Sequence, residues 1–428
     1  MGVVVQKFGG SSVAEVAKMR RCAEKAIAAR KRGHDVVVVV SAMGKTTDGL
    51  VALADEASPT PPRRELDMLL SSGERISIAV MAMVLDAMGQ PSISFTGRQI
   101  DFMTDAAHTQ AKVASVGVEK IRQQLADGRV VVIAGFQGVT SGGEITTLGR
   151  GGSDTTAVAI AAALGASACE IYTDVEGVYT ADPRVVPDAR RLDVVDYESV
   201  LQLASTGAKV LHSRSVELAA AYRVPLWVKH SQTDAPGTLI TTIDEVERRM
   251  SDLEAAQEAG AERMERLVIT GVALKDGLGR VTLDGIPDRP GIVAGVFGTL
   301  AEAGVNVDDI IQTVVTPSGD GERHATVSFT VDDRDIHRAT PVIETLLGNL
   351  GGSFSIDTGF AKVSAAGVGI RSHAGAAATM FKALAEEGIN ISNISTSEIK
   401  ISALVAADDG KRALQAVHAG FGLGDDSE

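Results

Sequence analysis

The chain has 428 residues but only two cysteines, Cys22 and Cys169, in apolar periodic surroundings. Two cysteines at this spacing predict neither a disulfide framework nor a zinc site, so both thiols are expected to be small buried hydrophobes. The eight histidines form no HExxH or similar cluster. No metal site built from protein ligands alone is therefore expected.

Aromatic residues and net positive charge are also scarce. Aromatics make up 4% of the chain, and the formal net charge is -14. Nucleic-acid binding needs a basic face and stacking rings, so this composition excludes it. A site for an anionic ligand must be built locally from a few lysines and arginines.

Long hydrophobic runs are missing as well. No apolar run approaches the length of a membrane span, and the strand-like N-terminus reaches Lys7 too soon for a signal peptide. A soluble cytoplasmic protein with no membrane partner is expected. The length and a hydrophobic content of 45% favour two or three domains with proper cores.

The first half of the chain alternates strands and helices. Val3–Phe8 predicts a buried strand, followed by Gly9-Gly10-Ser11-Ser12 and a helical pattern, and five valines follow in Asp35–Met43. Such alternation predicts an α/β fold, with a mostly parallel sheet covered on both faces. Ligands bind such sheets at the carboxyl ends of the strands. A Walker A motif at Gly44 is rejected because Val39 stands where its first glycine belongs.

The segment Thr147–Ala157, TLGRGGSDTTA, predicts a tight turn that leads into a helix. Glycines allow a close backbone approach to a ligand, and Ser153 suits the N-cap. Asp154 suits the positive end of the helix dipole, and Arg150 can bind a carboxylate or phosphate with two hydrogen bonds. The alternative is a glycine-rich connector without a ligand.

Two further segments carry candidate polar groups. Glu74 stands in an apolar helical pattern that runs from about Arg64 to Met88, either as a solvated charge or as a site carboxylate. A second helical pattern covers Thr109–Ala126. The loop after the strand Cys169–Thr173 offers Thr, Asp, Tyr and Arg side chains.

The last third of the chain contains an internal repeat, offset by 84 positions, between Arg289–Thr313 and His373–Ser397. The surrounding elements follow the order β-α-β-β-α-β, a ferredoxin-like unit. Two such units, separate from the glycine-rich turns of the first half of the chain, indicate regulation by small ligands. A duplicated scaffold without a ligand is the alternative.

Three parts are expected: a catalytic domain at 1–242, an amphipathic helical linker at 243–266 and a regulatory region at 267–428. The first regulatory domain covers about 280–356, and the second about 357–428, completed by a strand at 267–274. The linker spacing favours a helix packed on one domain over a dimer coiled coil.

Together these motifs resemble the aspartate kinases of the amino-acid kinase superfamily, over almost the whole chain. The carrying segments are KFGGSS (Lys7–Ser12), SAM (Ser41–Met43), SGER (Ser72–Arg75), FTGRQ (Phe95–Gln99), TTLGRGGSDTTA (Thr146–Ala157) and TDVEGVYTADPR (Thr173–Arg184). The repeats resemble tandem ACT domains, which bind amino acids. The resemblance implies a three-layer αβα kinase fold, ATP and Mg²⁺ as cofactors, and transfer of a phosphoryl group to the side chain of L-aspartate. The product, 4-phospho-L-aspartate, begins the route to lysine, threonine and methionine.

The resemblance also implies roles for single residues. Lys7 and Asp154 would be catalytic, with Mg²⁺ held through ATP rather than by protein ligands alone. The substrate would contact Ser41, Thr47, Glu74, Arg150 and Ser153. ATP would contact Lys7, Phe8, Gly9, Gly10, Ser11, Thr173, Asp174, Tyr179, Arg184 and Lys209.

Two effector sites are implied in the regulatory region. The first would comprise Asp288, Arg289, Pro290, Gly291, Ile292, Val293, Asn306, Val307, Asp308 and Gln312. The second would comprise Ala376, Ala377, Asn390, Ile391, Ser397 and Glu398. Such sites lie between ACT domains of two chains, so a homo-oligomer is expected. An α2β2 assembly, with a regulatory subunit started at Met250 or Met264, stays open.

The regulators implied are lysine and threonine acting in concert, while either amino acid alone stays compatible with two ACT domains. The chain departs from the family pattern twice. It has His212-Ser213-Arg214 where HPR is common, and Ser372-His373-Ala374-Gly375 lacks the proline of SHPG. A non-catalytic amino-acid sensor and a kinase for another small carboxylate are the competing functions.

Overall fold

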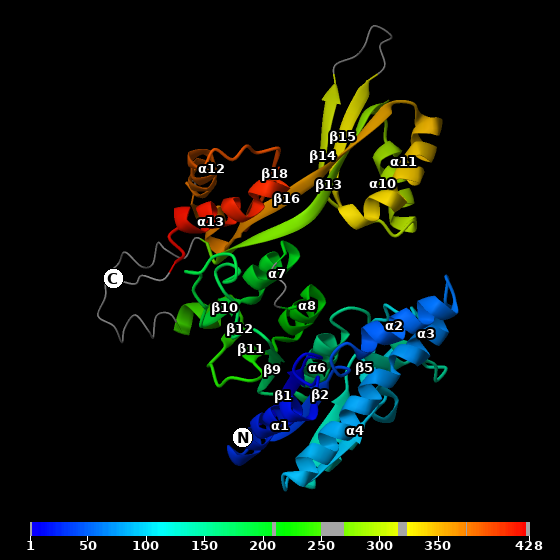
Figure 1. Cartoon of the computed structure of the whole chain (residues 1–428), viewed down its shortest axis with the longest axis vertical. Helices are drawn as coiled ribbons and strands as arrows, with labels where there is room; N and C mark the ends of the chain where they lie inside the picture. The colour runs from blue at the N-terminus through cyan, green and yellow to red at the C-terminus, as the bar shows by residue number, and fades with distance from the viewer. Residues whose placement is uncertain (1, 208–210, 250–268, 316–322, 374, 425–428) are drawn as a thin grey trace, which may run out of the picture. The chain divides into compact units, whose positions relative to one another are not determined.

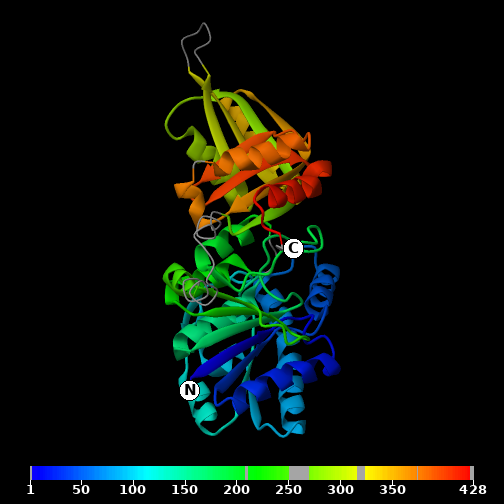
Figure 2. The same cartoon turned by 90° about the vertical axis from the view of Figure 1, so that its left-hand side faces the viewer.

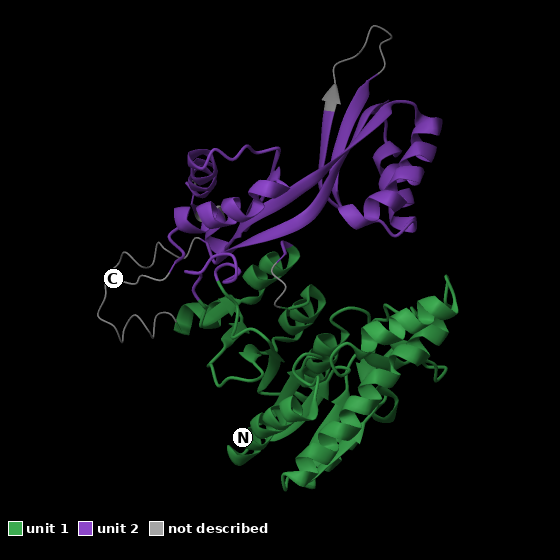
Figure 3. Cartoon of the chain, in the orientation of Figure 1, with its two compact units in different colours: residues 1–179, 191–205, 209–261 green, residues 180–190, 206–208, 262–428 purple. Residues whose placement is uncertain are grey.

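The computed structural model describes the chain except residues 1, 208–210, 250–268, 316–322, 374 and 425–428. The chain divides into two compact units (Figure 3). Unit 1 comprises residues 1–179, 191–205 and 209–261, and unit 2 comprises 180–190, 206–208 and 262–428. The expected boundaries were contiguous, whereas the chain passes from unit 1 into unit 2 and back at residues 180–190 and 206–208.

Unit 1 is built on an eight-stranded sheet of order β10-β12-β11-β9-β1-β2-β6-β3. Its strands are parallel except at the pairing of β11 with β12. The bounds are β1 Val3–Phe8, β2 Asp35–Val40, β3 Ser92–Phe95, β6 Val130–Ala134, β9 Ala168–Thr173, β10 Val194–Asp196, β11 Leu226–His230 and β12 Thr238–Thr241. The valine run of β2 is fully buried, as expected for a strand covered on both faces.

Helices lie on both faces of this sheet (Figure 1 and Figure 2), and the predicted three-layer αβα fold is confirmed. On one face α1 (Val16–Lys31) and α4 (Ser72–Ala87) pack on alternate side chains of β1, β2 and β6. On the other face α6 (Gly152–Leu164) packs on β1 and on α8 (Ser213–Tyr222). The other helices are α2 (Thr46–Ala57), α3 (Arg63–Leu70), α5 (Glu119–Ala126) and α7 (Tyr197–Ser205).

Two helical predictions need correction. The pattern from Arg64 to Met88 forms two helices, α3 and α4, which meet at Ser71. The Ser71 hydroxyl donates to the Met68 carbonyl at 3.0 Å, while the Ser71 N–H keeps its helical bond to the Asp67 carbonyl at 3.0 Å. The pattern Thr109–Ala126 forms a strand, β5 (Val113–Val116), before α5. This strand belongs to a small sheet with β4 (Phe102–Thr104), β7 (Gln137–Val139) and β8 (Ile145–Thr147).

One helical stretch in the described part of the chain, Arg63–Ala87, is long and apolar enough to span a membrane. This finding amends the expectation that no apolar run has that length. Half of its most apolar window, 50%, is buried inside the protein. A buried core helix has the same length and composition, so the stretch is weak evidence for a membrane span.

Unit 2 contains a six-stranded sheet of order β14-β15-β13-β16-β18-β17. Its strands are β13 (Gly271–Pro287), β14 (Val307–Val315), β15 (His324–Asp332), β16 (Ser353–Ala366), β17 (Asn393–Ser397) and β18 (Lys400–Ala406). Its helices are α10 (Ile292–Glu302), α11 (Ile336–Leu350), α12 (Ala376–Glu386) and α13 (Gly410–Gly420). The long strands β13 and β16 pair in antiparallel fashion and contribute side chains to two separate hydrophobic clusters. One cluster contains side chains of α10 and α11, and the other contains side chains of α12 and α13.

The segment 180–190 is part of the unit 2 core, although it follows the unit 1 strand β9 and the loop 174–179 along the chain. Ala181, Val186 and Ala189 are buried in the same cluster as side chains of β16, α12 and α13. The Thr180 hydroxyl also lies 2.9 Å from the Nε2 atom of the fully buried His418 on α13. The two compact units therefore share one continuous stretch of backbone at Tyr179–Thr180.

Candidate active site

The candidate active site of unit 1 lies at the carboxyl ends of β1 and β2. Lys7 near the end of β1 is 9% exposed, and its Nζ atom is 2.6 Å from the Asp154 Oδ1 atom of α6. At Gly10 a Cβ atom would come within 2.9 Å of the Ala42 carbonyl oxygen. Glycine thus lets the turns after the two strands pack together. The structure brings Lys7, Asp154 and these turns to one place.

Glu74, in the first turn of α4, contacts the turn that follows β2. Its side chain is buried, and its Oε1 atom accepts a 3.1 Å hydrogen bond from the Ala42 N–H. Among the described residues, its buried Oε2 atom has no hydrogen-bond partner. Burial raises the pKa of Glu74 to about 7, against the lowering effect of backbone hydrogen bonds. A buried carboxylate oxygen without a partner is suited to receive a cationic group.

The glycine-rich turn leads into α6, but its cap differs from the prediction. The N-cap is Gly151, with φ 68, rather than Ser153, which lies buried in the first turn. A Cβ atom at Gly151 would come within 2.2 Å of the His212 ring, so both its φ and its surroundings favour glycine. Asp154 lies in the first helical turn as expected, and Arg150 is exposed.

The other predicted substrate residues occupy the turn after β2 and the start of α2. Ser41 directly follows β2 and donates its N–H to the Phe8 carbonyl at 3.1 Å. Thr47 stands in the first turn of α2, and both residues are half-buried. They therefore lie on the same side of β2 as the Gly10 turn.

The predicted nucleotide residues fall in different places. Thr173 ends β9, its hydroxyl 3.0 Å from the Asp174 carboxylate, and Tyr179 forms an isolated bridge with Arg191. Arg184 belongs to unit 2, where its exposed guanidinium pairs with Asp182 at 2.7 Å. Lys209 lies outside the described residues.

A magnesium ion fits this arrangement only together with a nucleotide. The described residues contain no group of three or more His, Cys, Asp or Glu side chains that could hold a metal ion. Mg²⁺ is commonly held by one or two carboxylates and substrate phosphates. Asp154 is the carboxylate beside Lys7, so its chemistry suits a phosphate-held ion.

The first predicted effector site lies around the start of α10 and of β14. Gly291, with φ 94, caps α10, while the Asp288 carboxylate lies 3.5 Å from Gln312 Nε2 and 3.3 Å from Arg323 Nε. Asn306 and Val307 are at the start of β14. The N–H groups of the first turn of α10 can hold a carboxylate.

Asp308 has a partner that the sequence did not reveal. Its carboxylate is 2.5 Å from the buried Lys362 Nζ, which also pairs with Asp309 at 2.9 Å. Burial acts against charge on Lys362, yet the hydrogen bonds that its ammonium donates to both aspartates raise its pKa. An effector that contacts Asp308 therefore shares it with Lys362.

The second predicted effector site surrounds the start of α12. Ala376 and Ala377 open the helix, Asn390 and Ile391 precede β17, and Ser397 ends β17. Asn390, Ser397 and Glu398 are exposed. Residue 374, where the family proline is replaced, lies outside the described residues.

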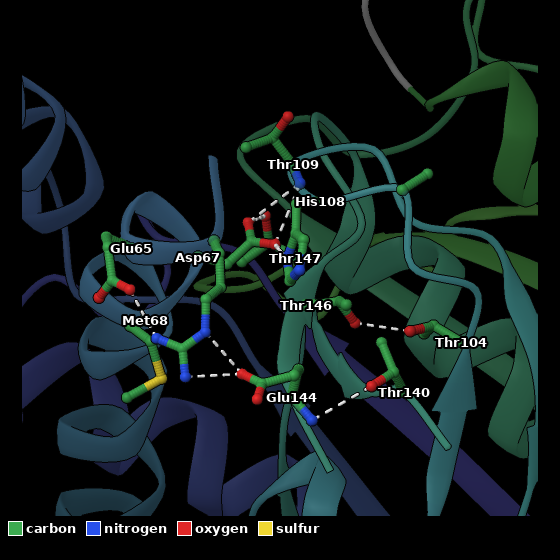
Figure 4. A network of polar contacts seen from close by, with 12 residues as sticks. Glu65, Asp67, Met68, Thr104, His108, Thr109, Thr140, Glu144, Thr146 and Thr147 are labelled. Carbon is green, nitrogen blue, oxygen red and sulfur yellow. Dashed lines mark hydrogen bonds and ion pairs between the residues drawn. The ribbon is translucent and has the colours of Figure 1, made fainter. Parts of the chain in front are cut away.

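Sequence reasoning missed a buried network around Asp67, which reaches Thr147 at the start of the glycine-rich segment (Figure 4). Asp67 of α3 is fully buried and accepts hydrogen bonds from Thr147, Thr109 and His108. Arg214 of α8 binds the Leu148 and Ala111 carbonyls. The available signal was an acidic residue inside the apolar stretch LDMLL.

Comparison with known proteins identifies the family. An amino acid kinase family model matches residues 2–230, and ACT domain models match 280–348 and 363–421. Aspartokinase of Pseudomonas aeruginosa is 47% identical over 424 residues, covering 99% of this chain and 98% of the relative. The chain belongs to the aspartokinase family. It is an ATP-dependent kinase that phosphorylates the side-chain carboxylate of L-aspartate and carries ACT regulatory domains.

Solved aspartokinases share the fold over nearly the whole chain. Aspartate kinase from Synechocystis has a TM-score of 0.80 at 32% identity, covering 98% of both chains. E. coli aspartokinase III, in complex with aspartate and ADP, has a TM-score of 0.78 at 26% identity, covering 98% of this chain and 99% of that one. The same E. coli enzyme has also been solved with lysine and aspartate.

Proposed function

We propose that Glu74, Arg150, Lys7 and Asp154 form the reaction centre for aspartate phosphorylation in this kinase. The observation that carries the proposal is the buried, unpartnered Oε2 atom of Glu74 beside the β2 turn. That oxygen would bind the α-ammonium of aspartate, and Arg150 would bind the α-carboxylate with two hydrogen bonds. Ser41, Thr47 and Ser153 would line the rest of the substrate pocket.

The proposed chemistry needs no general base, because an aspartate side chain with a pKa of about 4 is already ionised at neutral pH. Positioning and charge neutralisation then supply most of the rate. Lys7 would neutralise charge on the transferring phosphoryl group, at the point where its Nζ atom meets Asp154. Phe8, Gly9, Gly10 and Ser11 would hold phosphates through backbone contacts.

The remaining nucleotide contacts would come from Thr173, Asp174, Tyr179, Arg184 and Lys209. Mg²⁺ would arrive with ATP and be held by its phosphates, with Asp154 near enough to Lys7 to help place the reacting groups. The ion supplies positive charge to the phosphates when it is bound.

We further propose feedback inhibition by lysine and threonine in concert, through the two effector sites. Support comes from the paired ACT matches and from E. coli aspartokinase III, solved with lysine. An ACT-mediated homodimer, or an α2β2 assembly, would complete these sites. We place the reaction in the cytoplasm, at the first step toward lysine, threonine and methionine. The domain limits 1–242, 243–266 and 267–428 remain our working boundaries.

One assay tests these proposals together. ADP release is measured with Mg·ATP and L-aspartate, alone and with lysine, threonine or both. Turnover that falls only with both amino acids supports concerted control, whereas full inhibition by either one alone contradicts it. Lys7→Ala should reduce turnover strongly without unfolding the chain, and near-normal turnover would refute its role.

The competing functions give different results in the same assay. Absence of turnover, with aspartate or lysine still bound, would favour a non-catalytic sensor. Faster turnover with another small carboxylate than with aspartate would favour a kinase of different specificity.

A further inference from the structure

We propose that Asp67 and Arg214 are positioning residues that hold the loop 147–152, and with it Arg150, in the substrate-binding conformation. This inference rests on the proposed role of Arg150 as the ligand of the aspartate α-carboxylate. Neither residue is expected to contact substrate.

Asp67 is the centre of the arrangement (Figure 4). Its side chain is fully buried on α3, and its two oxygens contact the Thr147 hydroxyl, the Thr109 N–H and the His108 ring. Oδ1 accepts from the Thr147 hydroxyl at 2.5 Å and from the Thr109 N–H at 3.1 Å. Oδ2 accepts from the same N–H at 3.1 Å and lies 2.7 Å from His108 Nδ1. A buried carboxylate is stabilised by several such donors.

Two of these donors, Thr147 and Thr109, belong to or contact the loop 147–152. Thr147 is the last residue of β8, two residues before Gly149, and its carbonyl accepts the Ala111 N–H at 3.0 Å. Thr109 has φ 72, which is an outlier for a β-branched residue. Its carbonyl lies 3.0 Å from the position that a Cβ atom at Gly149 would take. Asp67 thus holds a strained residue directly against the glycine-rich turn.

Arg214 fixes the same loop through its backbone carbonyls. Its guanidinium donates to Leu148 at 3.0 Å and to Ala111 at 2.8 Å, from the second position of α8. The Leu148 N–H is bonded to the Phe136 carbonyl at 2.9 Å. Leu148 is therefore held at both its N–H and its C=O, two residues before Arg150. Because the backbone at Leu148 is fixed, the guanidinium of Arg150 has fewer accessible positions. This restriction favours bidentate binding of a carboxylate.

Asparagine cannot replace Asp67 in this network. Its amide has the shape of the carboxylate, but one of its two terminal atoms is a donor. In either orientation that NH₂ group would face the Thr109 N–H, which bonds both carboxylate oxygens, so part of the hydrogen-bond network is lost while the volume is conserved. Arg214→Lys likewise keeps the charge but loses the fork that spans two carbonyls.

The test measures the KM values for aspartate and ATP in the full-length chain. We expect Asp67→Asn and Arg214→Lys to raise the KM for aspartate about tenfold or more, while the KM for ATP stays within about twofold. Glu65→Gln is the matched control, since Glu65 lies on the same helix with an exposed carboxylate bonded to Arg64. It should leave both constants within about twofold.

A merely structural role is separated by a double-mutant cycle with Arg150→Ala. If Asp67 acts through Arg150, adding Asp67→Asn to Arg150→Ala should change the KM for aspartate by less than about twofold. Equal rises of the KM for aspartate and the KM for ATP would overturn the proposal. Additive effects of the two substitutions on the KM for aspartate would also overturn it. If Arg150→Ala alone leaves the KM for aspartate unchanged, the proposed role of Arg150 fails and this inference falls with it.

Thr147→Val provides a second route if Asp67→Asn does not fold. It removes one donor to Asp67 and leaves the carboxylate in place. A selective rise of the KM for aspartate supports the proposal that Asp67 holds the loop 147–152. An unchanged KM for aspartate in a folded Thr147→Val protein contradicts it.

Discussion

At the residue scale, Glu74 combines a structural cost with a proposed function. Its carboxylate is buried with one bonded oxygen and one without a partner in the described chain. Burial disfavours the charged form that the ammonium of aspartate needs. Substrate binding therefore favours the charged form of Glu74, whereas folding favours the neutral form. Both effects can be measured.

Substitution of Glu74 separates the two demands. Glu74→Gln should lower kcat/KM for aspartate roughly 10–100-fold through loss of a charge-assisted hydrogen bond. At pH 8 it should also raise the free energy of unfolding by about 1–2 kcal/mol, because a buried charge is removed. Steady-state kinetics and thermal unfolding check both effects, with exposed Glu56→Gln of α2 as control. Unchanged kinetics would contradict the role of Glu74.

The raised pKa of Glu74 also predicts a pH dependence. Below a pKa of about 7 the side chain takes up a proton and no longer attracts an ammonium group, whereas aspartate itself keeps both carboxylates ionised. We expect kcat/KM for aspartate to fall about tenfold per pH unit below pH 7. The Glu74→Gln variant should lose that slope. A flat wild-type profile between pH 6 and pH 8 would refute the assignment.

At the element scale, local pattern predicted the strands better than the connections. β1 has the expected limits, Val3–Phe8, and the glycine turn at Gly9-Gly10 follows it directly. The stretch 113–116 has only four residues, too few to distinguish a strand from a helix by periodicity. The hydrogen-bond network of Asp67, Thr109, Thr147 and Arg214 joins residues far apart in sequence, so no local pattern could reveal it.

The turn that opens α6 offers the sharpest test of an element. Gly151→Ala forces a side chain into φ 68 and against His212, so kcat/KM for aspartate should fall more than about 30-fold. The free energy of unfolding should drop by about 1–3 kcal/mol. Gly298→Ala in α10 is the matched control, because its Cβ atom meets open space. It should stabilise the helix by about 0.5–1 kcal/mol. Full activity of Gly151→Ala would show that the turn tolerates a shift.

At the scale of the whole molecule, the two compact units are not independent lengths of chain. The loop that follows β9 starts in unit 1 and enters the core of unit 2 at Thr180, directly after the proposed nucleotide residue Tyr179. Burial lowers the pKa of His418, which is bonded to Thr180, so this core contains a neutral imidazole near neutral pH. We therefore predict that changes in the core of unit 2 affect the proposed nucleotide residue Tyr179 through the backbone.

A core substitution in unit 2 should test this continuity. Val186→Ala removes two methyl groups from the cluster that holds the segment 180–190, at a cost of about 1–3 kcal/mol. Because the segment is then less firmly held, the KM for ATP should rise several-fold while the KM for aspartate stays unchanged. Trypsin should also cut faster at Arg184 and Arg190. Val305→Ala, in the other hydrophobic cluster of unit 2, is the matched control and should leave the KM for ATP unchanged. Equal effects of the two variants would mean that general loss of stability, rather than the shared segment, links unit 2 to nucleotide binding.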